Sequence, residues 1–108
     1  GDYLRGAREV CDRNGALVIL DEVQTGLGRT GAMWASELYG VVPDIITTAK
    51  GCTGAYAPAA ITATTSKIRE FFQERFFSHG HTYAAHPLVI AAIPAAVAEY
   101  KKLVGSAR

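Results

Sequence analysis

The sequence has 108 residues, 49% of them hydrophobic and 19% charged, and its net charge is +1. This balance is typical of a single globular domain, and without a basic run it gives no indication of binding to nucleic acid or membranes. The longest apolar stretch, residues 87–98, contains two prolines and is too short to cross a bilayer. Two cysteines, Cys11 and Cys52, have no metal-type spacing and suit a reducing cytosol, so we expect a cytoplasmic protein.

Residues 2–13 are predicted to form an amphipathic helix. Its apolar face consists of Leu4, Ala7, Val10 and Cys11. Asn14-Gly15 is a good helix stop, because both residues tolerate the left-handed conformation. The apolar run ALVIL, residues 16–20, comes next. It is continuous rather than alternating, which indicates a strand buried on both faces of a parallel sheet.

Residues 32–39 are predicted to form a short helix, with Thr30 as its cap and Gly40 at its end. The β-branched run 44–49 is a second strand candidate. A helix between two strands predicts a βαβ unit, since parallel neighbours need a crossover connection.

A glycine-rich turn at 51–54 precedes three more predicted elements. They are a strand at 59–65, a helix at 67–76 capped by Ser66, and a helix from Pro87 to about Leu103. Pro94 should kink the last helix, because proline lacks the N–H and crowds the preceding turn. The predicted fold class is therefore α/β, with a mostly parallel sheet and flanking helices.

The stretch GLGRTG, residues 26–31, matches the letters of a dinucleotide-binding fingerprint. That fingerprint needs its first glycine in the turn directly after a strand, and here DEVQT intervenes. The expected acidic residue at the end of the second strand is also missing, since Asp44 opens that strand instead. We therefore interpret the glycines as shaping a loop, with Arg29 available for an ion pair or an anion.

Two carboxylates and a lysine follow the predicted strands directly. Asp21 and Glu22 come after the first strand and Lys50 after the second, so parallel strands would bring them to the edge where α/β sheets bind ligands. The pleat of the strand decides which carboxylate faces the crevice. A lysine there can form a Schiff base with an aldehyde cofactor, and a carboxylate can keep a pyridine nitrogen protonated. A plain ion pair or two solvated charges remain as alternatives at this point.

The ordered motifs DEVQTGLGRTG, PDI, AKG and HGHTYAAHP resemble the signature of the class III, or ω-amino acid, aminotransferases. The resemblance covers nearly the whole chain. These enzymes use pyridoxal 5′-phosphate and have the fold of the type I pyridoxal-phosphate-dependent transferases. The resemblance therefore implies that residues 1–108 form part of the large, cofactor-binding domain.

The resemblance also implies a role for each matching residue. Asp21 would pair with the pyridinium nitrogen, Val23 would pack on the cofactor ring, and Gln24 would lie near its phenolic oxygen. Lys50 would hold the cofactor as an internal aldimine and move the proton as general base and acid. Thr82 would reach the cofactor phosphate of the neighbouring subunit, so a homodimer is expected.

The other motif residues have different implied roles. Glu22, Arg29 and the glycines around Arg29 would either be structural or support the residues that contact the cofactor. Ala55 and Ala85 depart from the family pattern, because relatives commonly have glycine there. Family members are several times longer, so we expect the rest of the large domain and the small domain to be absent. We also expect no appreciable activity from the 108-residue chain alone.

The implied function is transfer of an amino group from an amine or ω-amino acid to a 2-oxo acid, both small molecules. Two alternatives stay open. A racemase or aminomutase of the same family would use Asp21 and Lys50 in the same way. A truncated remnant would keep the motifs without catalysis. No nucleic acid or membrane partner is expected.

Three histidines and a phenylalanine cluster invite other interpretations. His79, His81 and His86 do not have a strong zinc spacing, and no cysteine lies close, so no metal site is expected. They are interpreted as loop residues near an interface or a cap. The phenylalanines in residues 71–77 are interpreted first as core, and second as a surface left bare by missing chain.

Overall fold

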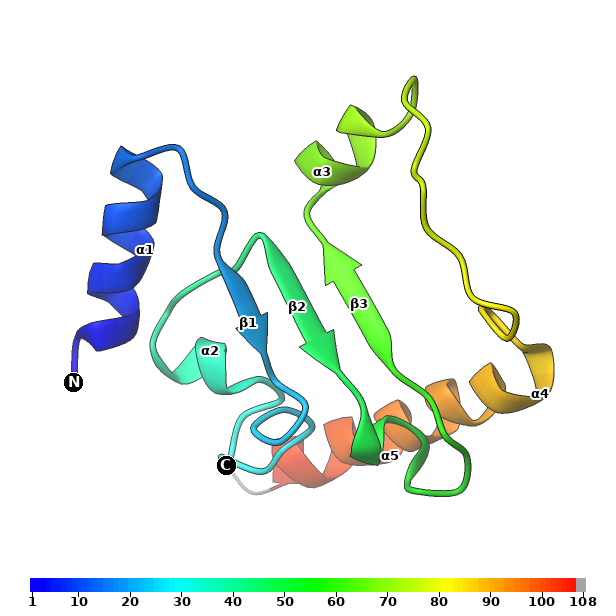
Figure 1. The fold of residues 1–108 in the computed structure, drawn as a ribbon. Coiled ribbons are helices and arrows are strands. Elements are labelled where there is room, and N and C mark those ends of the chain that lie inside the picture. Colours follow the sequence, from blue (N-terminus) through cyan, green and yellow to red (C-terminus); the bar gives the residue numbers. More distant parts are fainter. Residues whose placement is uncertain (107–108) are drawn as a thin grey trace.

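The computed structural model describes residues 1–106 as a thin α/β layer, 41 × 41 × 18 Å in extent. Its three-stranded sheet has the order β1–β2–β3 (Figure 1). The strands are β1 (Ile19–Asp21), β2 (Ile45–Thr48) and β3 (Ile61–Thr64). β1 and β2 are parallel, with Asp21 opposite Thr47, which confirms the predicted βαβ unit. β3 runs antiparallel to β2, so this part of the sheet is mixed.

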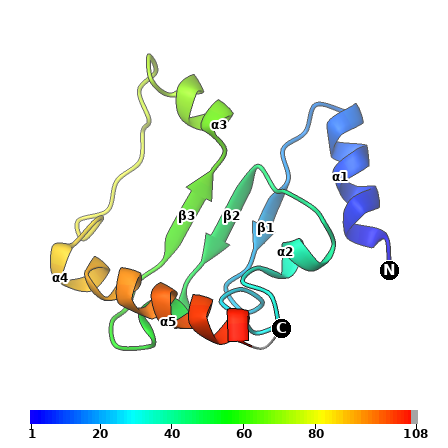
Figure 2. The same ribbon diagram turned by 180° about the vertical axis from the view of Figure 1, so that it is seen from behind.

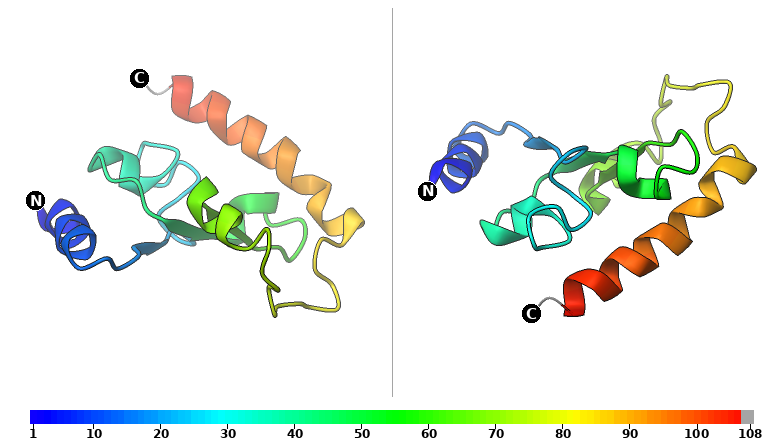
Figure 3. Two further views of the ribbon diagram at one scale, coloured as in Figure 1. Left: turned by 90° about the horizontal axis from the view of Figure 1, so that it is seen from above. Right: turned by 90° about the horizontal axis from the view of Figure 1, so that it is seen from below.

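Helices surround the sheet on several sides (Figures 2 and 3). They are α1 (Tyr3–Arg13), α2 (Ala35–Leu38), the 3-10 turn η1 (Lys50–Thr53), α3 (Ser66–Phe71), α4 (Pro87–Ile90) and α5 (Ala92–Ser106). α5 runs across the end of the sheet at which β1 and β2 finish, and it packs against η1 (Figure 1). That end of the sheet is the one that carries the candidate site.

Two helices stop with the same hydrogen-bonded device. In α1 the N–H of Ala16 donates to the carbonyl oxygen of Cys11 at 2.9 Å, and Gly15 has a φ of +65°. In α2 the N–H of Val41 donates to the carbonyl oxygen of Ser36 at 3.2 Å, and Gly40 has a φ of +63°. Both are Schellman closures, in which a left-handed residue satisfies the last free carbonyls. The helix stops predicted at both glycines are confirmed.

The predicted helix starts are partly wrong. α2 begins at Ala35 rather than at residue 32, and its cap position is occupied by Trp34 instead of Thr30. Residues 23–34 form turns and bends, because the glycines in this segment favour such conformations over helix. Ser66 is the first residue of α3 rather than its cap, and α3 ends at Phe71 instead of residue 76.

The last predicted helix is interrupted, as expected from its internal proline. α4 begins with Pro87 in its first turn and ends at Ile90, and α5 resumes at Ala92. Pro94 has no N–H with which to bond the carbonyl oxygen of Ile90, so the helical ladder breaks there.

The core is small and lies where β1, the loop after it and η1 meet. Its buried apolar residues are Val18, Leu27, Ala32, Val41 and Cys52. Burial raises the pKa of the Cys52 thiol. β1 is not buried on both faces as predicted, because Ile19 is 60% exposed.

An ion pair ties α1 to the sheet at the end away from the candidate site. Asp44, just before β2, accepts a hydrogen bond from Arg8 Nη1 at 2.6 Å and another from the N–H of Val18 at 2.8 Å. These contacts hold the pKa of the Asp44 carboxyl below its usual value, with the Val18 N–H as the larger cause. Asp44 is therefore structural, which agrees with its position at the start of the strand.

Candidate active site

The carboxyl ends of β1 and β2 place the predicted catalytic pair at one edge of the sheet. Asp21 is the last residue of β1, and Lys50 follows β2 after a single intervening residue. The N–H of Glu22 donates to the carbonyl oxygen of Thr47 at 2.8 Å, which keeps the two strand ends together. This edge is where open α/β sheets form ligand crevices.

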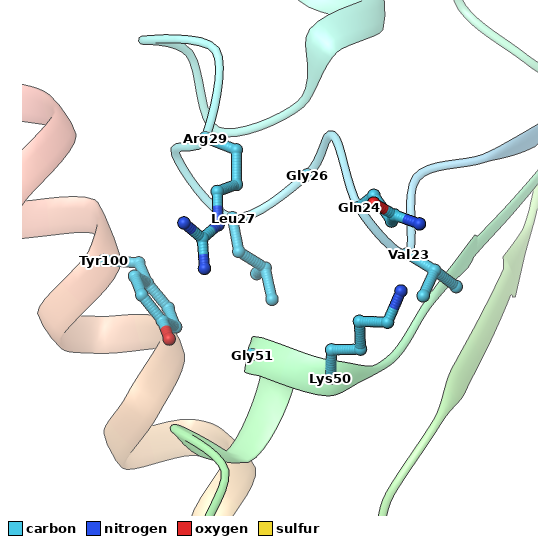
Figure 4. Close-up of a pocket in the computed structure, with 8 residues that line it drawn as sticks. All are labelled: Val23, Gln24, Gly26, Leu27, Arg29, Lys50, Gly51 and Tyr100. Atoms are coloured by element: carbon cyan, nitrogen blue, oxygen red, sulfur yellow. The ribbon is translucent and has the colours of Figure 1, made fainter.

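Lys50 occupies an unusual backbone conformation. It opens η1 with a φ of +46°, in the left-handed region that residues other than glycine rarely adopt. Such a conformation costs about 1–3 kcal/mol and is concentrated at functional sites. Within residues 1–106 the Lys50 amine has no hydrogen bond or ion pair. Figure 4 shows it extending toward the loop at Val23 and Gln24.

The Asp21 carboxylate is exposed, and one of its two oxygens already accepts a hydrogen bond. Its Oδ1 accepts a hydrogen bond from the N–H of Val23 at 2.9 Å, which fixes the carboxylate against the start of the loop. Among the described residues it forms no ion pair with Lys50, so the simple Asp–Lys pair left open by the sequence is absent there. Oδ2 accepts no hydrogen bond from residues 1–106 and is available to a ligand.

The pleat of the chain separates the two adjacent carboxylates. Glu22 is only 2% exposed and turns toward the start of α2, whereas Asp21 stays exposed. The Glu22 carboxylate accepts hydrogen bonds from the N–H groups of Ala35 and Ser36. Glu22 is thus held by hydrogen bonds within the protein, and Asp21 is the carboxylate that stays exposed at this edge of the sheet.

The glycines after Glu22 shape a loop, as predicted. Gly28 and Gly31 have φ values of +90° and +89°, which favour glycine. A Cβ at Gly26 would lie 2.7 Å from the Trp34 ring and 2.8 Å from the Glu22 carbonyl oxygen. None of the three stands at the start of a helix, which a nucleotide fingerprint requires.

A cleft of about 330 Å³ opens beside Lys50 (Figure 4). Its lining residues are Val23, Gln24, Gly26, Leu27, Arg29, Lys50, Gly51 and Tyr100. Tyr100 comes from α5, fifty residues after Lys50, and a Cβ at Gly51 would lie 3.1 Å from its hydroxyl. Tyr100 could not be predicted from the sequence, because no local pattern connects α5 to the turn that carries Lys50.

Thr82 is not brought to this cleft. The segment that carries it, residues 76–86, runs beyond β3 on the side of the sheet away from β1 (Figure 1). Its role toward a neighbouring subunit stays a prediction. Ala55 and Ala85, the two expected departures from the family pattern, have φ values of +65° and +53°. The backbone at both positions is thus of the kind that glycine adopts without strain.

The remaining sequence hypotheses have structural answers within residues 1–106. No group of three histidines, cysteines or acidic residues there is arranged to hold a metal ion. No helix in that range is long and apolar enough to cross a membrane. The phenylalanines at 71–77 are not core, because Phe76 is 90% exposed and Phe71 is 53% exposed. Too little of the described chain packs against α3 to cover them.

Fold and site together define an α/β protein with a strained lysine and a free carboxylate at the carboxyl ends of two parallel strands. The chain belongs to the class III aminotransferase family, whose family model, described as Aminotransferase class-III, matches residues 1–104. The cofactor of this family is pyridoxal 5′-phosphate. The predicted fold class and family are confirmed.

Individual relatives cover most of this chain. An adenosylmethionine-8-amino-7-oxononanoate aminotransferase from Nitratidesulfovibrio vulgaris is 47% identical over 95 residues, which are 83% of this chain and 18% of the relative. A putrescine aminotransferase from Pectobacterium atrosepticum is 47% identical over 98 residues, 91% of this chain and 21% of the relative. The chain therefore spans about a fifth of the length of these curated relatives.

The solved structures that this chain resembles are also transaminases. A taurine:2-oxoglutarate aminotransferase from Bifidobacterium kashiwanohense, in complex with PLP and glutamate, matches with a TM-score of 0.89 and 41% identity. The match covers 93% of this chain and 22% of that one. A transaminase from the marine bacterium Virgibacillus matches with a TM-score of 0.88 and 39% identity over 95% of this chain and 24% of its own.

Proposed function

We propose that residues 1–108 are part of the large, cofactor-binding domain of a pyridoxal-phosphate-dependent aminotransferase, with the rest of that domain and the small domain outside this chain. The reaction moves an amino group from an amine or ω-amino acid to a 2-oxo acid. The observation that carries the proposal is the strained, unpaired Lys50 at the same edge of the sheet as the exposed carboxylate of Asp21.

The residues of the cleft fit pyridoxal phosphate. The cofactor supplies an aldehyde carbon that condenses with amines and a ring that accepts the electron pair from the substrate carbon. A lysine amine without a partner, an apolar side chain at Val23 and an amide at Gln24 line one space of about 330 Å³. Pockets for ligands of this size begin at about 300 Å³. Asp21 is not among the residues that line this space, but it is exposed at the same edge of the sheet and would supply the carboxylate that suits a protonated ring nitrogen.

Each residue of the chain has a defined task in this proposal. Lys50 would hold the cofactor through its amine and would move a proton at the substrate carbon as general base and acid. Asp21 would keep the ring nitrogen protonated through Oδ2, while the Val23 N–H fixes Oδ1. Val23 would pack on the ring, and the Gln24 amide would contact its phenolic oxygen.

The partners follow from the same proposal. Thr82 contacts the cofactor phosphate of a neighbouring subunit, so the complete protein is a homodimer. This role suits the position of Thr82 on a segment beyond β3, away from its own cleft. The substrates are a small amino donor and a 2-oxo acid, with no nucleic acid or membrane partner. The location is cytoplasmic, in keeping with two cysteines that form no disulfide.

The test is to map where the cofactor attaches. The complete polypeptide is incubated with pyridoxal phosphate, reduced with borohydride and analysed by peptide mass. We expect a single adduct on Lys50, none on Lys67, Lys101 or Lys102, and no such adduct in Lys50→Ala. Lys67→Ala is the matched control and keeps the adduct. Label spread over the surface lysines would overturn the proposal.

A second measurement addresses the class of reaction and the chain itself. Amino transfer from the donor to an added 2-oxo acid supports the aminotransferase. Inversion or a shift of the amino group within one molecule would instead identify a racemase or aminomutase. The chain of residues 1–108 alone is expected to show no turnover, and turnover by it would refute the assignment to one part of a larger domain.

A further inference from the structure

We propose that Glu22 is a positioning residue of the cofactor site, whose buried carboxylate closes residues 22–36 into a fixed arc. The arc determines where Asp21 and Val23 stand relative to Lys50. This inference rests on the proposed function, because it concerns the same cofactor. It assigns to Glu22 a measurable effect on cofactor binding, beyond stability.

The Glu22 carboxylate uses both oxygens within the protein. Oε2 accepts hydrogen bonds from the N–H of Ala35 at 2.7 Å and from the Thr25 hydroxyl at 3.1 Å. Oε1 accepts one from the N–H of Ser36 at 2.8 Å. Glu22 thus takes the place of the missing cap of α2, because the side chain at the cap position makes no such bond. The two N–H groups that it binds, those of Ala35 and Ser36, lie thirteen and fourteen residues after Glu22 in the sequence.

The backbone of Glu22 is tied as firmly as its side chain. Its N–H donates to the carbonyl oxygen of Thr47 in β2, the strand that leads to Lys50. Its carbonyl oxygen accepts from the N–H of Gly26 at 3.0 Å. One residue therefore connects β2, the loop and the start of α2. These bonds restrain the backbone on either side of Glu22, at Asp21 and Val23.

A second, independent observation is that the arc is tightly packed between Gly26 and Trp34. Gly26 lies against the Trp34 ring so closely that no Cβ fits between them. Trp34 directly precedes the two N–H groups that Glu22 binds. A displacement of the start of α2 is therefore passed back across the arc to the loop that lines the cleft. Leu27, in that loop, is buried and donates its N–H to the Met33 carbonyl oxygen at 2.7 Å.

The test is Glu22→Gln in the complete polypeptide assembled with pyridoxal phosphate. Glutamine has nearly the same shape, but it has a single acceptor oxygen, and its NH₂ group would face a backbone N–H. The matched control is Glu37→Gln, which removes the same charge from an exposed residue of α2 whose side chain makes no hydrogen bond within the described range. Both variants are measured well below their unfolding temperatures.

Two readouts separate positioning from mere stability. The first is the dissociation constant of pyridoxal phosphate, titrated by absorbance, which we expect to rise about tenfold or more in Glu22→Gln and less than twofold in Glu37→Gln. The second is the absorbance maximum of the bound cofactor, which should shift in Glu22→Gln alone. A lower unfolding temperature with unchanged affinity and spectrum would overturn the inference.

The outcomes also distinguish this inference from the function on which it depends. If Lys50 in the unsubstituted protein takes no cofactor, the proposed function itself fails. If Lys50 is labelled but Glu22→Gln keeps the parent affinity, only the role of Glu22 fails. Should Glu22→Gln not fold, Thr25→Val removes one donor to Oε2. It is expected to weaken cofactor binding in the same direction by a smaller factor, and parent affinity in that variant overturns the inference.

Discussion

Replacing Gly26 by alanine should destabilise the protein through lack of space alone. The added Cβ would lie 2.7 and 2.8 Å from two carbons of the Trp34 ring and 2.8 Å from the Glu22 carbonyl oxygen. Gly26 does not have a left-handed φ, so no backbone strain is added. Relief of the contact with the carbonyl oxygen would disturb the hydrogen bond that this oxygen accepts from the Gly26 N–H, and the Trp34 ring would have to move as well.

The magnitude follows from two opposing effects. Forcing an extra carbon into a filled space costs about 1–3 kcal/mol. Replacing glycine also reduces the entropy of the unfolded chain, which returns about 0.4–1 kcal/mol. The net expectation for Gly26→Ala is a loss of about 1–2 kcal/mol in the free energy of unfolding.

The assay is urea unfolding of the complete polypeptide, followed by circular dichroism, with Trp34 fluorescence as a local reporter. The matched control is Gly6→Ala, inside α1, where a Cβ meets nothing within 4 Å. It should gain about 0.5–1 kcal/mol, because alanine is the better helix former. A Gly26→Ala protein as stable as its parent would refute the claim that the arc has no slack.

Three further predictions concern acid, thiol chemistry and strain. Asp44→Asn should lower the free energy of unfolding at pH 7, and the difference from the parent protein should disappear in acid. A carboxyl whose pKa is lowered by folding stabilises the protein above about pH 4, and this stabilisation is lost as the pH falls through the pKa of the folded state. Urea unfolding midpoints of both proteins, measured as a function of pH, test this. Cys52, buried and with a raised thiol pKa, should be alkylated by iodoacetamide far more slowly than the half-buried Cys11, and equal rates of peptide labelling would contradict its burial. Ala55→Gly should stabilise the protein by about 0.5–1 kcal/mol, since it removes a left-handed alanine at φ +65°, and a loss of stability on urea unfolding would show that the turn carries no strain.

Much of the fold could be predicted because its signals are local. Asn14-Gly15 and Gly40 end helices through their own backbone conformation, and Pro94 interrupts a helix through its own missing N–H. The parallel pairing of β1 and β2 follows from their order along the chain. The direction of β3 has no local signal, because a connection that contains only the short 3-10 turn η1 can return the chain either way.

The parts of the site that could not be predicted depend on distant residues. Whether Asp21 or Glu22 faces the crevice is decided by the N–H groups of Ala35 and Ser36, which capture Glu22 from the other end of the arc. Thr30 matched the residue type of a cap, but a carboxylate from β1's end fills that role. Tyr100 reaches the cleft only because α5 packs against η1.

The thin shape of the sheet has a practical consequence for handling this chain by itself. Within residues 1–106, β1 and β3 each have one neighbour, so each leaves a row of backbone donors and acceptors unpaired. The radius of gyration is 15.5 Å, against about 13 Å for a compact domain of 100 residues. Exposed strand edges next to an apolar residue such as Ile19 can form backbone hydrogen bonds with the strand edges of other molecules of this chain. Residues 1–108 produced alone should therefore aggregate, and aggregation would report on uncovered edges rather than on a defective site.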